Sequence, residues 1–415
     1  MCIRLSVYRH AIVFLLTQLP IIALPQVMIG NHAAPFDSIT STWLATVPQN
    51  VFGRDSILTV TLDKQYTQMV VGEDTVTSDA IGHCLFRNIS ADSTYAAVMT
   101  DALGHITHGN IQFTFLPIIQ LKGTFGYGYQ DGTVTIANPE LGEDSLFTAS
   151  IKWRGGTTNS ANKHKRNYKL KFDHDVKLFG LRSDNNWMLD AGQPDVFRMR
   201  NRIAMDLWND MARQPYYADQ EPKARNGVRG LMVEVFLNNE YRGLYNFSEV
   251  IDRKQLKLKK VDEKTGEIHG CLYKGVDWNY TQMFGLIESY DNTSEVLYGI
   301  EVKYPDLNDN DTTDWASYVN ANNYALECTD EAFEHHISDY FDIPLLMDYS
   351  LFVSIVNAVD NSGKNMYWAI YDKATDNRLT PAPWDLDATF GQRWGGRLIA
   401  EEEEKNYASP AYMTD

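Results

Sequence analysis

Two short stretches near the end of the chain have residue types and spacings that could transfer a phosphoryl group. In D-N-S-G-K-N at 360–365, Asp360 and Asn365 stand five residues apart. This is the Asp-to-Asn spacing of a protein-kinase catalytic loop, where the Asp accepts the hydroxyl proton and the Asn holds magnesium. In P-W-D-L-D-A-T-F-G at 383–391, Asp385 and Asp387 add two carboxylates. Because Mg²⁺ prefers oxygen ligands, the sequence offers a candidate base, Asp360, and candidate metal ligands in Asn365, Asp385 and Asp387.

The spacing alone favours an ordinary turn over a metal site, because Asp and Asn side chains often bond local backbone in turns. Other stretches bear on this choice. They are R-G-G-T-T at 154–158, K-R-N-Y-K-L-K-F at 165–172, M-R-N-R-I-A-M-D-L at 199–207, V-F-L-N-N-E-Y-R-G-L-Y-N-F-S-E at 235–249 and L-Y-K at 272–274.

Together with the two aspartate motifs, these stretches resemble the spore-coat protein H (CotH) kinase family, in the family's order and over about two thirds of the chain. Members are secreted or surface-linked atypical protein kinases. The resemblance implies an α+β, atypical protein-kinase-like fold over residues 117–415. It also implies ATP as co-substrate, Mg²⁺ or Mn²⁺ as cofactor, and transfer of the γ-phosphate to Ser or Thr of an exported or cell-surface protein.

Basic residues upstream could bind the nucleotide. The segment 165–172 alternates as a strand does, which sets Lys169 and Lys171 on one face. Alternation alone predicts lysines that point into water, whereas the resemblance implies that Lys165, Lys169 or Lys171 neutralises phosphates. The Gly- and Thr-rich loop at 154–163 begins with Arg154 and is a candidate phosphate loop.

Kinases pair the phosphate-binding lysine with a glutamate, and the candidate here is Glu249. It ends a predicted hairpin with strands at 231–237 and 241–247, joined at Asn238-Asn239, where Asn tolerates positive φ. Lys274 is either a further phosphate contact or a surface lysine.

Two amphipathic helices are predicted around these motifs. The first spans 195–213, with arginines on its solvated side and an apolar face of Val196, Met199, Ile203, Leu207 and Met211. The second spans 343–359, with Asp342 as N-cap and Pro344 in the first turn. Its end delivers Asp360 into the catalytic-loop motif.

The N-terminal region predicts export. Residues 1–25 resemble a signal peptide, because basic residues precede an apolar run at 11–24 that is too short and too interrupted for a confident membrane span. The alternative is an uncleaved anchor helix. We expect a secreted or cell-surface protein with no membrane span beyond the signal sequence.

Residues 26–116 predict a small all-β, sandwich-like accessory domain. Three β-branched, partly alternating runs lie at 56–62, 65–71 and 95–100. Farther along, Asp131-Gly132 predicts a hairpin turn. At the other end, 28 residues follow Asp387 where the family usually continues with helices, so a truncated C-terminal lobe is one interpretation.

The net charge of −17 and the lack of a basic stripe argue against nucleic acid as a partner. A metal-bound nucleotide or a basic protein substrate fits the sign better, and the charge by itself favours a solvated acidic surface over either. An alternative function is a non-catalytic surface module that binds protein or glycan. The β-rich domain and the 23 Tyr and 9 Trp residues favour that alternative. Magnesium-dependent nucleotide binding discriminates between the two.

Overall fold

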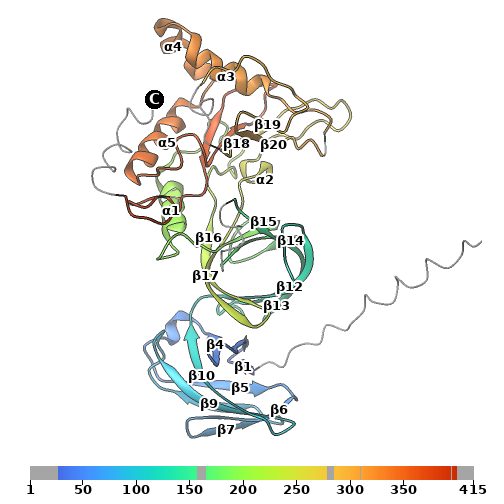
Figure 1. The fold of residues 1–415 in the computed structure, drawn as a ribbon, viewed down its shortest axis with the longest axis vertical. Coiled ribbons are helices and arrows are strands. Elements are labelled where there is room, and N and C mark those ends of the chain that lie inside the picture. The colour runs from blue at the N-terminus through green and yellow to red at the C-terminus, as the bar shows by residue number, and fades with distance from the viewer. Residues whose placement is uncertain (1–26, 157–164, 278–284, 309, 394, 400–415) are drawn as a thin grey trace, which may run out of the picture. The chain divides into compact units, whose positions relative to one another are not determined.

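The computed structural model describes residues 27–156, 165–277, 285–308, 310–393 and 395–399. The expected signal peptide and most of the loop at 154–163 lie outside the described residues. The chain forms two compact units (Figure 1). The first comprises Met1–Gln120, Thr135–Ser145 and Asn238–Tyr241, and the second comprises Leu121–Val134, Leu146–Leu237 and Arg242–Asp415.

The first unit contains a sandwich of two sheets. One sheet has the strand order β2 (His32–Ala34), β1 (Val27–Ile29), β5 (Ser56–Leu62) and β8 (Gly82–Phe86). The other has the order β3 (Phe36–Asp37), β4 (Thr42–Thr46), β10 (Ile106–Thr114), β9 (Thr94–Asp101), β6 (Tyr66–Val71) and β7 (Asp74–Thr77). Buried side chains from both sheets, including Trp43, Phe86 and Phe113, form one core. The three predicted strands of this region correspond to β5, β6 and β9.

Seven strands of the chain close a barrel. In spatial order they are β11 (Ile118–Lys122), β12 (Gln130–Ala137), β13 (Ser145–Arg154), β14 (Asn167–Lys177), β15 (Ser183–Asp190), β17 (Glu240–Ser248) and β16 (Gly230–Leu237). The predicted hairpin is present as β16 and β17, and Asn238 and Asn239 have φ of 51° and 66°. Both positive angles suit the tight turn between the strands.

The predicted turn at Asp131-Gly132 is wrong, because both residues lie inside β12. A Cβ atom on Gly132 would stand 2.7 Å from the Lys122 carbonyl oxygen. Glycine is therefore needed here for close approach to β11, a role that glycines also have within strands.

The remainder of the second unit combines an antiparallel sheet with helices. The sheet order is β19 (Val296–Leu297), β20 (Ile300–Tyr304), β18 (Cys271–Gly275), β21 (Met366–Ile370) and β22 (Thr380–Pro383). The helices are α1 (Arg200–Met211), α2 (Arg253–Leu256), α3 (Ala316–Glu327), α4 (Asp330–His336) and α5 (Ile343–Ile355). The whole is a β-rich α+β architecture. Within the described ranges, none of the helices has the length and apolar character needed to cross a membrane.

The first predicted helix is shorter and turned differently from the prediction. It begins at Arg200, and the side chains expected in the core are exposed, Val196 by 81% and Ile203 by 48%. Trp208 is buried instead and packs its ring against the aromatic rings of α5. Arg202, predicted on the solvated side, is 6% exposed and donates to the Val228 carbonyl. Packing on α5 therefore decides which face of α1 is buried.

The second predicted helix is confirmed as α5, including its cap. The Asp342 carboxylate accepts from the Leu345 N–H, and Leu345, Tyr349 and Phe352 are buried. The helix ends at Ile355, four residues before the predicted end. The chain then turns through Asn357, which has φ of 50°, and enters the loop that carries Asp360.

Candidate active site

The loop after α5 holds Asp360 and Asn365 side by side. The Asn365 amide nitrogen Nδ2 donates to Asp360 Oδ2 at 2.8 Å. Both side chains are buried, and Lys364 Nζ lies 3.8 Å from the same Asp360 oxygen. Because the bond uses the amide nitrogen of Asn365, the amide oxygen is the atom of that side chain that could bind a cation.

Asn361, which was not singled out in the sequence, joins this loop to the second aspartate motif. Its fully buried Nδ2 donates to the carbonyl oxygens of Asn365 at 3.0 Å and Trp384 at 2.7 Å. Its own carbonyl accepts from the Tyr349 hydroxyl on α5 at 2.7 Å. Through its side chain and its backbone carbonyl, Asn361 therefore fixes both aspartate motifs relative to α5.

The pairing of β21 with β22 brings the two motifs together. Met366 stands opposite Pro383 in the antiparallel register, so the residues that flank this pair, Asn365 and Trp384, are neighbours. The Trp384 N–H donates to the Asn365 carbonyl at 2.9 Å. Asn365 and Asp385 both have φ of 55°. Positive φ at residues other than glycine costs free energy and gathers at functional sites.

Four carboxylates influence one another at this junction. Burial is the largest cause that raises the pKa of Asp385, and the charge of Asp190 adds to it. The pKa of Asp387 is raised well above its ordinary value by burial and then by the charges of Asp385, Asp190 and Asp360. The Asp385 residue is exposed by accessible area, although many protein atoms stand close to its carboxylate. These four carboxylates, of Asp190, Asp360, Asp385 and Asp387, are called the acidic cluster. Their negative charge is not fully compensated by the cationic neighbours.

The donor set fits a magnesium or manganese ion. Among the described residues, no three His, Cys, Asp or Glu side chains are arranged to hold an ion by themselves. Mg²⁺ typically takes one or two protein carboxylates and completes its shell with water and substrate phosphates. Asp385, Asp387 and the amide oxygen of Asn365 are ligands of that kind, and a cation would relieve their repulsion.

Two cations face the acidic cluster. Arg154, at the end of β13, has its guanidinium 5.3 Å from the centre of the Trp384 ring. Lys274 on β18 lies 6.0 Å from the same ring centre. Burial, followed by the charge of Arg154, lowers the pKa of Lys274 to about 8, while Asp385 acts in the opposite direction. Arg154 and Lys274, which were both predicted to contact phosphate, therefore lie beside the acidic cluster.

The three lysines of the predicted strand have different surroundings. The pKa of Lys169 is lowered by burial and then by Lys152 and Arg154, so Lys169 lies beside the same basic group. Burial and the charge of Arg198 lower the pKa of Lys165 to about 8, and its Nζ bonds the Leu244 carbonyl. Lys171 is exposed, which is the outcome that alternation alone predicted.

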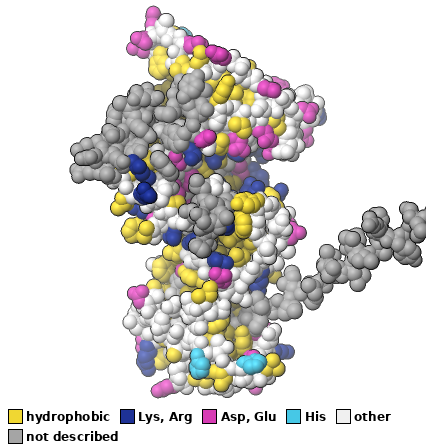
Figure 2. Space-filling model, viewed as in Figure 1, with side chains coloured by type: hydrophobic (Ala, Val, Ile, Leu, Met, Phe, Trp, Pro, Cys, Tyr) yellow, Lys and Arg dark blue, Asp and Glu magenta, His cyan; other side chains and the backbone are white. Residues whose placement is uncertain are grey.

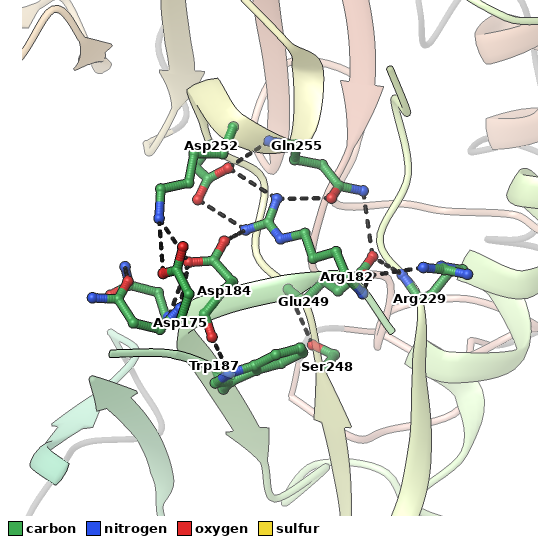
Figure 3. Close-up of polar contacts among 12 residues, drawn as sticks. Asp175, Arg182, Asp184, Trp187, Arg229, Ser248, Glu249, Asp252 and Gln255 are labelled. Carbon is green, nitrogen blue, oxygen red and sulfur yellow. Dashed lines mark hydrogen bonds and ion pairs between the residues drawn. The ribbon is translucent and has the colours of Figure 1, made fainter. Parts of the chain in front are cut away.

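Glu249 lies in a different set of contacts, the Arg182 network, defined by Arg182, Asp184, Arg229, Glu249 and Asp252 (Figure 3). The expected pairing of Glu249 with a strand lysine is therefore not what the structure has. The fully buried Glu249 carboxylate accepts from the backbone N–H groups of Arg182 and Arg229, each at 3.0 Å, and lies 3.3 Å from the Arg229 guanidinium. It anchors the point where the chain leaves β17.

Residues outside the predicted set of site residues complete the site. Asp190, at the end of β15, accepts from Asn201 Nδ2 at 2.7 Å, and Asn201 Oδ1 accepts from the Leu386 N–H at 3.0 Å. Asp190, Asn201, Arg202 and Asp385 line a cavity of about 10 Å³, the size of one water molecule or ion. The buried Nε and Nη1 of Arg202 have no hydrogen-bond partner among the described residues. In the sequence, the turn signal Asp190-Ala-Gly192 and the polar Asn201 within the predicted helix were the clues to this part of the site.

Comparison with known proteins gives a family. Residues 151–414 match the family described as CotH kinase protein. Four solved chains match, among them the Bacteroides ovatus mixed-linkage glucan utilization locus SGBP-B in complex with mixed-linkage heptasaccharide, at 8% identity and a TM-score of 0.13. That match covers 39% of this chain and 58% of the other, and likeness at this level carries no inference about fold or ligand. No curated protein matches. Because the family match covers more than half of the chain, this protein belongs to the CotH kinase protein family.

Proposed function

We propose that this chain is a metal-dependent phosphotransferase with an atypical kinase-like fold, which moves the γ-phosphate of ATP to Ser or Thr of an exported or cell-surface protein. Family membership supports a kinase-like domain. The observation that carries the proposal is the junction of Asp360 and Asn365 with the raised-pKa carboxylates of Asp385 and Asp387. Carboxylates whose pKa is shifted by burial and by neighbouring charges gather at functional sites.

Each residue of the acidic cluster has a role in this proposal. Asp360 orients the acceptor hydroxyl and takes its proton, and the bond from Asn365 keeps its carboxylate in one orientation. Asn365, Asp385 and Asp387 hold the divalent ion. Magnesium, when bound, offsets negative charge on the transferred phosphoryl group. Asp190 and Asn201 act behind these residues by fixing the backbone at Leu386.

Arg154, Lys274 and Lys169 are proposed to bind the nucleotide phosphates. Repulsion from Arg154 contributes to the lowered pKa of both lysines, so an anion bound between the three side chains would stabilise their charges. Of the strand lysines, Lys169 suits this role better than Lys171, which is exposed. Lys165 stands near Asp190 and remains a second candidate.

The test is calorimetric titration of ATP into the protein with and without Mg²⁺. We expect binding that needs the metal, because unneutralised carboxylates repel a triphosphate. Asp385→Asn should lose metal-dependent binding and radiolabelled phosphate transfer together. Asp210→Asn is the matched control, since Asp210 is exposed on α1. Metal-independent affinity, or no affinity, would favour a non-catalytic surface module of the same family.

A further inference from the structure

A basic cleft of about 890 Å³ lies in the second unit, apart from the acidic cluster. It is lined by parts of three segments, at 177–183, 221–229 and 249–260, and Figure 2 shows Lys and Arg side chains beside the position of α2. Ten of its lining residues are Lys or Arg, and two are Glu. The chain as a whole has 37 basic residues and a net charge of −17, so this concentration of cations is opposite in sign to the rest of the molecule.

Four of these ten cations form ion pairs within the protein. Arg182 contacts Asp184 and Asp252, and Arg229 contacts Glu249. Lys254 lies 3.1 Å from Asp184 and Lys259 lies 3.2 Å from Glu221. These pairs neutralise part of the positive charge of the cleft.

Arg253 donates to the Leu258 carbonyl oxygen at 3.2 Å, and the remaining five cations of the cleft form no ion pair with any described residue. They are Lys177, Lys223, Arg225, Lys257 and Lys260. Four of them are exposed and Lys257 is half-buried. They come from all three segments, so the unbalanced positive charge is spread around the cleft. The ligand that fits such a surface has several negative charges along its length.

The lining also limits the kind of anion. None of the lining residues is aromatic, so the cleft offers no ring on which a nucleobase or a sugar could stack. Small-molecule pockets are mostly apolar, which this cleft is not. A nucleic-acid duplex or a membrane is too broad to enter a concave cleft of this volume, whereas an extended peptide fits. We propose that the basic cleft binds an anionic peptide segment, whose charges are carboxylates or phosphorylated side chains.

The test uses the full chain without nucleotide or metal, so its outcome is independent of the proposed phosphate transfer. Fluorescence anisotropy compares an octa-glutamate peptide, a Gly-Ser peptide with phosphoserines of the same total charge, and an uncharged Gly-Ser peptide. We expect both anionic peptides to bind with affinity that falls as salt rises, and the uncharged peptide not to bind. Tighter binding of one anionic peptide identifies carboxylates or phosphates as the natural charges.

Variants locate the binding. Lys223→Gln, Arg225→Gln and Lys257→Gln combined should weaken binding at least tenfold. The matched control combines Arg54→Gln, Lys64→Gln and Lys264→Gln, which remove the same charge from exposed positions outside the cleft. Thermal melts establish that both triple variants fold. Equal losses in the two variants would overturn the proposal in favour of general attraction. Full competition by ATP would also overturn it, because the cleft would then be a nucleotide site.

Discussion

The acidic cluster and the Arg182 network both gather charged side chains in the second unit, but they balance these charges differently. In the Arg182 network, burial acts to raise the pKa of Asp184, and Arg182, the Asn186 N–H and Lys254 outweigh it, so the pKa is lowered. In the acidic cluster, burial and neighbouring carboxylates raise the pKa of both Asp385 and Asp387. In one group the charges are compensated within the protein, and in the other the repulsion between carboxylates remains.

This difference separates a structural role from a chemical one. A charge network whose carboxylates are matched by guanidinium groups and N–H donors holds backbone segments together. A cluster with uncompensated carboxylates destabilises the fold, and such strain is retained where binding or catalysis needs it. Glu249 shows why the comparison matters, since the resemblance implied a role beside ATP whereas its contacts are those of an anchor.

The largest effect is expected from a change that breaks the chemistry of the acidic cluster and leaves its proposed metal ligands in place. Asp360→Asn should lower phosphate transfer at least about a hundredfold, because a general base contributes roughly that much or more. Affinity for Mg-ATP should stay nearly unchanged, since a base acts chiefly in the transition state. Radiolabelled transfer and nucleotide titration measure the two quantities. Full transfer by this variant would refute the assigned role, and a collapsed thermal melt would show that Asp360 is structural.

The next largest effect is expected when the Arg182 network is broken by removing the Glu249 carboxylate. Glu249→Ala leaves two backbone N–H groups and the Arg229 guanidinium without their acceptor. We expect a loss of about 2–3 kcal/mol in the free energy of unfolding, below the usual cost for a fully buried pair because Arg229 is 35% exposed. Denaturant titration of the metal-free protein measures it. Asp387→Asn is the contrasting variant and should not lower stability. Equal destabilisation by the two changes would contradict the comparison.

A smaller effect is expected from removing single lysines. It tests whether cations that face the acidic cluster differ from cations that face water. Lys274→Ala should weaken Mg-ATP binding about tenfold, or about 1.4 kcal/mol, whereas Lys171→Ala should change it little. Because the pKa of Lys274 is about 8, its charge and part of the nucleotide affinity should be lost as pH rises through that value. Calorimetry between pH 7 and 9 tests this. An unchanged pH profile in Lys274→Ala would assign the titration to another group.

The smallest effect concerns the pH dependence of stability without metal. The folded-state pKa of Asp387 lies above its unfolded value, so its contribution destabilises the fold as pH rises from the unfolded value of about 4 through the folded pKa. The stability advantage of Asp387→Asn over the natural protein should therefore grow from pH 4 to pH 7. Saturating Mg²⁺ should remove that advantage. Thermal melts across this pH range measure it, and a constant difference would show that Asp387 does not titrate.

The sequence could predict features that depend on residues close together in the chain. The Asp342 cap and the buried stripe of α5 follow from helical spacing, and the Asn238-Asn239 hairpin follows from the tolerance of Asn for positive φ. The family match follows from motifs of a few residues each. Each of these features was present as expected, because local hydrogen bonding and backbone conformation determine it.

Only the tertiary structure decided which side chains face which neighbours. The apolar residues of α1 predicted one buried face, but the packing of Trp208 on α5 turned another face inward, along with Arg202. Lys169 and Lys171 alternate identically, yet only Lys169 lies beside Arg154. Asp190 on β15 and Asn201 on α1 contribute to the site although both are distant in the chain from Leu386. Long-range packing and the sum of many charges set these outcomes, and neither is encoded by spacing within one segment.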